Sequence, residues 1–156
     1  MTDKKTIDAE THRATAVQTH GETWELLEKT DRTPMDNELM IHTAHTSCYH
    51  WLRVGKVVNH QRGEWLISRV YATLGLGDTA VRHARKCAEL TYANPDEMAD
   101  FDHAFALEAL ARSHAIAGEA ILATQYRIQA KEAGEVIQDE GDRTYFLGDL
   151  EEGRWS

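Results

Sequence analysis

Apolar residues recur along this chain at intervals of three and four, the spacing that places side chains on one face of an α-helix. In residues 59–75, for example, one helical face is apolar and carries Ile67, Val70, Tyr71 and Leu74. No alternating pattern typical of a strand reaches a useful length. The periodicity therefore predicts an all-α protein with six helices, over residues 8–30, 36–54, 59–75, 78–93, 98–117 and 119–139.

The breaks between these segments have local causes. The chain has only two prolines, Pro34 and Pro95, and both fall between periodic segments. Thr33-Pro34 favours an extended residue followed by a helix start. Glycines in the turn 74–78 and at position 118 separate further helices. Short breaks of this kind predict about three antiparallel helical hairpins.

Two stretches of the chain match one another at an offset of 43 residues. The first stretch contains Arg69, Ala72, Gly75, Ala80 and Glu89. The second contains the same types at Arg112, Ala115, Gly118, Ala123 and Glu132. An internal repeat of this length indicates that one supersecondary unit stacks on a copy of itself.

The repeated segments resemble tetratricopeptide (TPR) repeats. The resemblance covers residues 64–133 and rests on the Leu74-Gly75 turn and on small residues at Ala80, Ala84 and Ala123. A TPR unit has about 34 residues, so the offset of 43 requires longer helices or loops here. The segments 49–51 (YHW), 62–65 (RGEW) and 68–72 (SRVYA) also resemble a family of small uncharacterised bacterial proteins, a likeness that implies no activity.

The TPR resemblance implies a concave surface lined by the first helix of each hairpin. On helices 59–75 and 98–117, a second stripe of arginine and aromatic residues lies opposite the apolar face. Such residues often anchor interfaces, because they combine a large area with directional polar groups. We therefore expect a protein-interaction module that binds a peptide or an acidic segment. Its expected groove residues are Arg62, Trp65, Arg69, Phe101, Phe105, Glu108 and Arg112.

Three alternatives remain open from the sequence. The same cluster could be structural, with Glu108 pairing with Arg112 on its own helix and with Arg69 across the hairpins. The cleft could instead bind a small molecule, or belong to an enzyme of unknown reaction that uses His45 or His103 as an acid–base group. A terminal helix could also mediate homo-oligomerisation.

The charge distribution limits the partners. The net charge is −9, yet residues 53–86 hold seven bases and two acids and are net positive. An acidic protein of this kind is a poor general nucleic-acid binder, so we expect no nucleic-acid partner. Arg82, Arg85 and Lys86 share one helical face, either as a solvated surface or as a docking patch for an acidic partner or for the chain's own tail.

The C-terminal segment differs in composition from the rest. Residues 139–156 hold six acids and two bases, together with several large apolar side chains, interrupted by three glycines. The sequence predicts one TPR-like domain over residues 1–140 and an irregular acidic tail over 141–156. The tail is either disordered or docked on the basic middle, and Tyr145, Phe146, Leu147 and Trp155 favour docking.

The sequence contains no recognisable catalytic or cofactor motif. Nine histidines raise the possibility of a metal site formed by His42 and His45 with Asp100 and His103. Few glutamates accompany them, so we expect neither a metal nor another cofactor. The sequence has two cysteines, Cys48 and Cys87, and their spacing does not match a zinc-binding motif. The two thiols are therefore expected to be reduced and buried in a cytoplasmic protein. No apolar run reaches eighteen residues, so no membrane association is expected.

Overall fold

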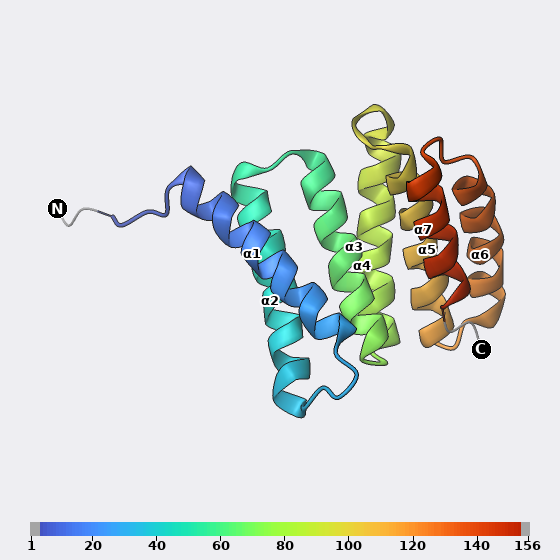
Figure 1. Cartoon of the computed structure of the whole chain (residues 1–156), viewed down its shortest axis with the longest axis horizontal. Helices are drawn as coiled ribbons and strands as arrows, with labels where there is room; N and C mark the ends of the chain where they lie inside the picture. The colour runs from blue at the N-terminus through green and yellow to red at the C-terminus, as the bar shows by residue number, and fades with distance from the viewer. Residues whose placement is uncertain (1–3, 154–156) are drawn as a thin grey trace.

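A computed structural model describes residues 4–153, and within this range the chain is helical apart from its connections (Figure 1). The six predicted segments correspond to the first six α-helices, and the described range contains no strand. The prediction of an all-α fold is therefore confirmed. The elements are α1 (Ala9–Glu28), α2 (Pro34–Val54), α3 (Val57–Thr73), α4 (Gly77–Ala93), the 3-10 turn η1 (Pro95–Glu97), α5 (Asp100–Ile116), α6 (Ala120–Glu135) and α7 (Glu140–Glu151).

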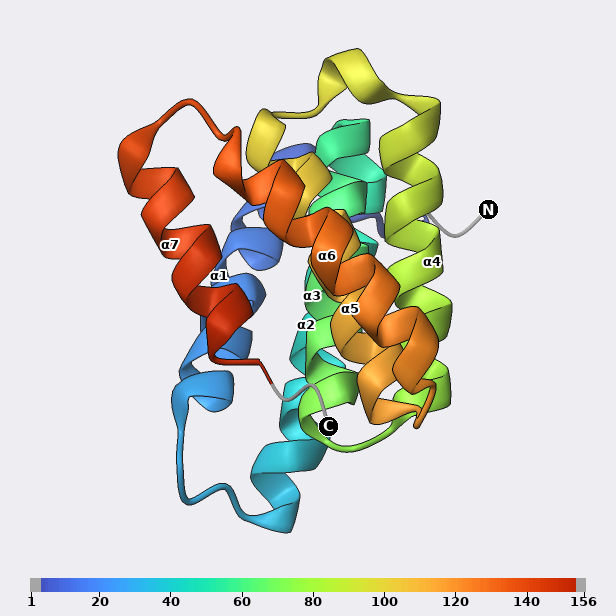
Figure 2. The same ribbon diagram turned by 90° about the vertical axis from the view of Figure 1, so that its right-hand side faces the viewer.

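Consecutive helices pack as antiparallel neighbours, in the hairpins α1/α2, α3/α4 and α5/α6. Contacts between α2 and α3 and between α4 and α5 join one hairpin to the next, and α3 also contacts α5. The last helix, α7, packs against α5 and α6. Figure 2 shows α1 and α7 toward one side of the molecule and α4 toward the other. None of the helices described within residues 4–153 is both long and apolar enough to cross a bilayer.

The start of α2 shows how local sequence fixes a helix boundary. Thr33 Oγ1 accepts a hydrogen bond from the Asp36 backbone N–H at 3.1 Å, and Asp36 Oδ2 accepts one from the Thr33 N–H at 3.0 Å. This reciprocal capping box satisfies two backbone donors that the helix itself leaves unpaired. Pro34 occupies the first turn, where the missing N–H has no cost.

The two repeated segments adopt the same turn. Gly75 and Gly118 have φ angles of 78° and 81°, a left-handed conformation that favours glycine. After each glycine, the next residue donates its backbone N–H to the carbonyl five positions earlier, at 2.9 Å in both turns. This is the helix-ending arrangement that left-handed glycine permits. The offset of 43 residues is therefore a structural repeat as well as a sequence one.

A pair of stacked rings also repeats at this offset. Tyr71 stacks on His83 with ring centres 5.6 Å apart and an angle of 12° between the planes. His114 stacks on Tyr126 with the same distance and the same angle. The two residue types have changed places, so the geometry of the pair is kept while its chemistry is reversed.

Small residues allow the hairpins to approach closely. Ala84 and Ala88 on α4 pack against Ala109 on α5 in one buried cluster. At the first residue of α4, a Cβ on Gly77 would lie 2.5 Å from backbone atoms of Ala117. Helix backbones can come this near only where side chains are absent or small, so the repeat places small residues where one unit meets the next.

The prediction of six helices followed by an irregular tail is wrong, because Glu140–Glu151 form the helix α7. Asp139 caps this helix by accepting a hydrogen bond from the Asp142 N–H at 2.9 Å. Phe146 is fully buried and Leu150 nearly so, in a cluster with residues of α5 and α6. Gly134 on α6 makes room for the Phe146 ring. Burial of these side chains stabilises a helix despite its two glycines; Trp155, also named as an apolar tail residue, lies outside the described residues.

Candidate ligand-binding groove

The seven residues predicted to line a groove lie together where α3 faces α5. Trp65 of α3 meets Phe105 of α5 edge to face, with ring centres 5.3 Å apart. The Arg62 guanidinium lies over the Phe101 ring at 5.2 Å. It also forms two hydrogen bonds of 2.9 Å to the Asp102 carboxylate, which raise the pKa of Arg62. The aromatic stripes of the two helices therefore form one continuous surface.

Glu108 lies at the centre of this surface with 1% of its area exposed. Its carboxylate accepts hydrogen bonds from Trp65 Nε1 at 3.0 Å and from Arg69 at 3.5 Å, and it forms a close ion pair with Arg112 on its own helix. The buried charge is thus compensated from three directions, as a buried carboxylate requires. Both ion pairs of the structural alternative are formed.

Asp149 of α7 completes the charge network. Its two carboxylate oxygens accept hydrogen bonds from Arg69 at 2.7 and 3.0 Å, and one oxygen lies 3.7 Å from Arg112. Burial by itself would raise the pKa of Asp149, but the hydrogen bonds and charge of Arg69, aided by Arg112, hold this pKa below its usual value. The C-terminal helix thus supplies an acid to the arginines of the repeat.

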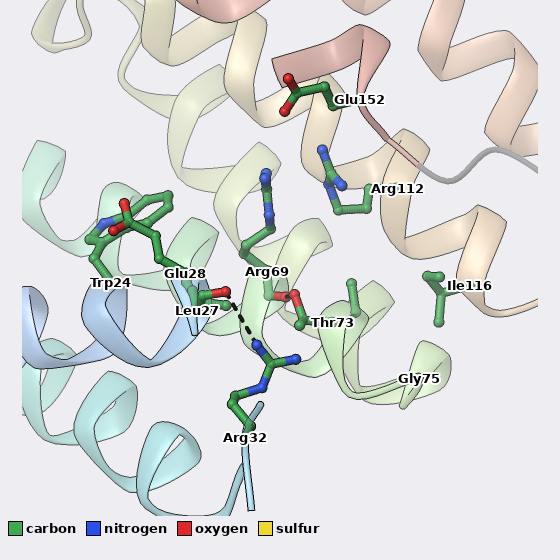
Figure 3. A pocket seen from close by; sticks show the side chains of 11 residues that line it. Trp24, Leu27, Glu28, Arg32, Arg69, Thr73, Gly75, Arg112, Ile116 and Glu152 are labelled. Carbon is green, nitrogen blue, oxygen red and sulfur yellow. Dashed lines mark hydrogen bonds between the residues drawn. The ribbon is translucent and has the colours of Figure 1, made fainter. Parts of the chain in front are cut away.

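Two adjoining pockets open along this surface. The first, here called the arginine pocket, has a volume of about 370 Å³ (Figure 3). Figure 3 shows Arg69 and Arg112 side by side, with Glu152 on one side of them and Arg32 on the other. Arg32 donates to the backbone carbonyls of Leu26, Leu27 and Lys29, so these partners are neutral.

The second pocket, here called the aromatic pocket, has a volume of about 190 Å³ and is open to solvent. The residues around it are mostly large and apolar and come from four helices. Trp24 lines both pockets and stacks on Trp65 with ring centres 5.8 Å apart. The lining consists of His20 and Trp24 of α1, Gln61, Arg62 and Trp65 of α3, Phe101, Asp102 and Phe105 of α5, and Tyr145 of α7.

The contributions of α1 and α7 were missed by the sequence analysis. Trp24 belongs to a helix without a recognisable copy in the repeat, and Asp149 and Tyr145 fall in the segment predicted to be irregular. An intact helical period across residues 142–150, with Phe146 and Leu150 four apart, was the available signal. The glycines at 141 and 148 obscured it.

The histidines proposed for acid–base chemistry lie elsewhere. His45 Nε2 is 2.9 Å from the Tyr71 hydroxyl, and His103 Nε2 is 3.2 Å from the Pro95 carbonyl oxygen. Neither residue lines the arginine or the aromatic pocket. His20 does line the aromatic pocket, and burial lowers its pKa. Asp100, named with His103 as a metal ligand, accepts a hydrogen bond from the Gln138 backbone.

A different group of side chains has the composition of a metal site. Within residues 4–153, one such group was found, and it consists of Cys48, His60 and Glu64. Cys48 and Cys87 are both buried free thiols. Burial raises the pKa of Cys48 to about 12, with a further contribution from the charge of Glu64. This group lies on α2 and α3, apart from the two pockets described above.

Comparison with known proteins gave no guidance on function: no family model, no curated protein and no solved structure matches the chain. The functional proposal therefore depends on the groove itself.

Proposed function

We propose that this protein is a TPR-like interaction module that binds an extended peptide along the groove between α1 and α7. One apolar or aromatic side chain of the peptide enters the aromatic pocket, and a neighbouring acidic group meets the arginine pocket. The observation that carries the proposal is the aromatic pocket, to which four helices contribute rings from positions as distant as Trp24 and Tyr145. The sequential hairpins, with α1, α3, α5 and α7 lining one surface, support the TPR-like assignment.

The size of the aromatic pocket favours a side chain over a small molecule. Small-molecule sites typically enclose about 300–1,000 Å³, whereas the aromatic pocket has about 190 Å³. It is open to solvent, and Trp24 lines both it and the arginine pocket. An open groove with two adjoining pockets suits a chain that places successive side chains along it.

The charges of the groove define which acid the peptide can contribute. Arg69 and Arg112 already share Asp149 and Glu108, so a second carboxylate gains less from them. The hydrogen bonds of Arg32 go to neutral acceptors, and its guanidinium lines the arginine pocket. Arg32 is therefore the residue that we propose pairs with the acid of the peptide.

The alternative of an enzyme in this cleft has less support. His45 and His103, its proposed acid–base groups, do not line either pocket. His20 is the histidine nearest to such a role, but its Nε2 already accepts a hydrogen bond from Trp24 Nε1 at 3.2 Å and is therefore not free to take a proton from a substrate. A structural role for Glu108, Arg69 and Arg112 is compatible with the proposal, because these residues build the floor of the groove.

Fluorescence anisotropy with a panel of labelled peptides tests the proposal. Each peptide carries one Trp, Phe or Leu and one Asp or Glu at a varied spacing, and scrambled neutral peptides serve as references. Phe105→Leu and Tyr145→Ala alter the aromatic pocket without removing a hydrogen-bond partner of Glu108. Each substitution should weaken peptide binding at least about 30-fold, as truncation of an interface anchor does. Tyr92→Ala and Ile121→Ala, at exposed positions on α4 and α6, are the controls. A panel in which no peptide binds, or in which all four variants bind equally, would refute the groove assignment.

A further inference from the structure

Two helices, α2 and α3, bring a second cluster of reactive side chains together, outside the groove. Cys48 lies on α2, and His60 and Glu64 lie on successive turns of α3. One sulfur, nitrogen or oxygen atom of each residue lies within 4.8 Å of the corresponding atoms of the other two. Cys48 is buried, and the other two side chains are 22% and 12% exposed. A thiol, an imidazole and a carboxylate thus converge at the edge of the core.

The spacing within this cluster fits ligation of a single ion. Two nitrogen or oxygen ligands at about 2.0–2.1 Å from a tetrahedral metal lie about 3.3 Å from one another. His60 Nε2 and Glu64 Oε1 are 3.4 Å apart. Their separation of four residues on one helix face keeps them adjacent without any contribution from other elements. The Cys48 sulfur lies within 4.8 Å of the ligand atoms of His60 and Glu64.

The backbone around Cys48 is shaped for close approach. A Cβ on Gly63 would lie 2.9 Å from Cys48 Sγ, so any larger residue at this position would push α3 away from α2. Gly63 therefore lets α2 and α3 pack closely enough for the Cys48 thiol to lie near His60 and Glu64.

Neighbouring side chains hold the Glu64 carboxylate in place through hydrogen bonds, as residues around a metal site commonly hold its ligands. His83 of α4 has Nδ1 2.6 Å from Glu64 Oε2, the oxygen that does not face His60. The His83 ring is itself held by its stack on Tyr71, whose hydroxyl is bonded to His45. Partners of this kind fix the orientation of ligating groups and raise metal affinity.

We propose that Cys48, His60 and Glu64 bind one zinc ion, with His83 orienting the carboxylate. A ligand set of one sulfur, one nitrogen and one oxygen is within the range that Zn²⁺ accepts, whereas Mg²⁺ and Ca²⁺ require oxygen ligands. On binding, the Cys48 proton leaves to solvent and the thiolate bonds to the metal. Three protein ligands leave the fourth position open.

A path from solvent reaches the site. Glu64 and His83 line a surface pocket of about 340 Å³, together with Arg82, Lys86 and Glu89. The basic face of α4 therefore surrounds the entrance, and Glu89, 4.0 Å from Lys86, offsets part of its charge. Of the three proposed ligands, Glu64 is the one that lines this pocket, so solvent reaches the cluster from the side of its carboxylate.

A metal-free role for the same residues makes a different prediction. Glu64 could act only as an ion-pair partner of His60 and His83, whose hydrogen bonds and charges lower its pKa although burial opposes the shift. In that case Cys48 is an ordinary core residue and has no part in metal binding. Whether the Cys48 sulfur bonds to the metal therefore distinguishes the zinc site from the metal-free ion pair.

Titration of the chelator-treated protein with Co²⁺, followed by absorption spectroscopy, tests the proposal. Cobalt in a tetrahedral site gives visible bands, and a bound thiolate adds a charge-transfer band in the near ultraviolet. We expect a 1:1 complex with both features, displacement of Co²⁺ by Zn²⁺, and a melting temperature that rises with the Zn²⁺ concentration. Absence of a 1:1 complex would overturn the proposal.

Variants locate the site. Cys48→Ser should remove the charge-transfer band, and His60→Gln and Glu64→Gln should each weaken Zn²⁺ binding at least about 100-fold, with about 10-fold for His83→Phe. His50→Gln is the matched control, because His50 lies outside the cluster and pairs with His12 through Nδ1 atoms 2.7 Å apart. Binding that survives Cys48→Ser and His60→Gln but is lost in His50→Gln would place the metal elsewhere. Because His60 is partly exposed, its variant is expected to fold even if Cys48→Ser does not, and circular dichroism checks both.

Discussion

Replacement of Asp149 by asparagine tests how α7 is held on the repeat. The substitution keeps the shape of the side chain but removes the charge that faces Arg69 at 2.7 and 3.0 Å and Arg112 at 3.7 Å. An asparagine oxygen can still accept one hydrogen bond, so the loss is one charge-assisted bond and the ionic part of the other. The variant therefore measures the ion pair rather than the packing of the helix.

The magnitude follows from the burial of the pair. Hydrogen bonds to charged groups contribute about 1.5–3 kcal/mol each, and breaking a fully buried ion pair costs about 3–5 kcal/mol. Asp149 and Arg69 retain 15% and 16% of their side-chain exposure, and Arg69 keeps Glu108 as a partner. We therefore expect a loss of about 2 kcal/mol in the free energy of unfolding. For a chain of this size the melting temperature should fall by about 4–8 °C.

The pH dependence has a definite sign. The pKa of Asp149 is lowered in the folded protein, so this residue binds protons more readily in the unfolded chain. Its contribution to stability is therefore fully present above the unfolded pKa, about 3.9, and is lost as the pH falls through the folded pKa. The difference in stability between the native protein and Asp149→Asn should be largest near pH 7 and should shrink toward zero below about pH 4.

Urea denaturation at pH 7 and at lower pH, monitored by circular dichroism, measures this difference. Hydrogen exchange of residues 140–151 shows in addition whether α7 opens before the rest of the fold. Glu151→Gln removes one negative charge from an exposed position two residues away and serves as the control. An effect of Asp149→Asn below about 0.5 kcal/mol, or one equalled by Glu151→Gln, would refute the role assigned to the Arg69–Asp149 pair.

Three further predictions concern packing, capping and thiol reactivity. Gly134→Ala should destabilise the protein by about 1–3 kcal/mol, because its Cβ would lie 2.4 Å from the buried Phe146 ring. At Gly148 an added Cβ meets no atom within 4 Å, so Gly148→Ala should stabilise α7 by about 0.5–1 kcal/mol. Thermal melts of the two variants compare them directly. Thr33→Ala removes half of the capping box of α2 and should cost about 1 kcal/mol in urea denaturation, with Thr15→Ala, in the middle of α1, as the reference. Iodoacetamide at pH 8 should label Cys48 and Cys87 only slowly in metal-free folded protein and rapidly in urea, because burial raises the pKa of both thiols; fast labelling of the folded state would contradict the buried environment.

The repeated part of the chain was predictable because its local signals agree with one another. Gly75 and Gly118 mark equivalent turns, and the helical period places Trp65 and Phe105 on the faces where they are found in contact. Since stacked repeats bring equivalent positions together, an offset in sequence translates directly into proximity in space. The Arg69, Glu108 and Arg112 cluster was therefore predictable from the sequence.

The tail was not predictable by the same route. Glycines at 141 and 148 lower the helix propensity of this segment, and a short helix is marginal on its own. Burial of Phe146 and Leu150 against α5 and α6 supplies the missing stability, but this contact depends on the assembled repeat. Tertiary packing thus overrides the low helix propensity of this segment.

The Cys48, His60 and Glu64 cluster could be predicted from the sequence only in part. His60 and Glu64 are four residues apart on one helix, so their adjacency follows from the sequence. Cys48 precedes the turn into that helix, and its distance from Glu64 depends on how closely α2 and α3 pack, which the contact at Gly63 sets. The groove between α1 and α7 is lined by residues of α3 and α5, and the cluster lies between α2 and α3, so α3 contributes residues to both sites. Trp65 and Glu64 are neighbours in sequence, and consecutive residues on a helix project in directions about 100° apart, so a single helix can serve a binding surface on one side and a metal site on the other.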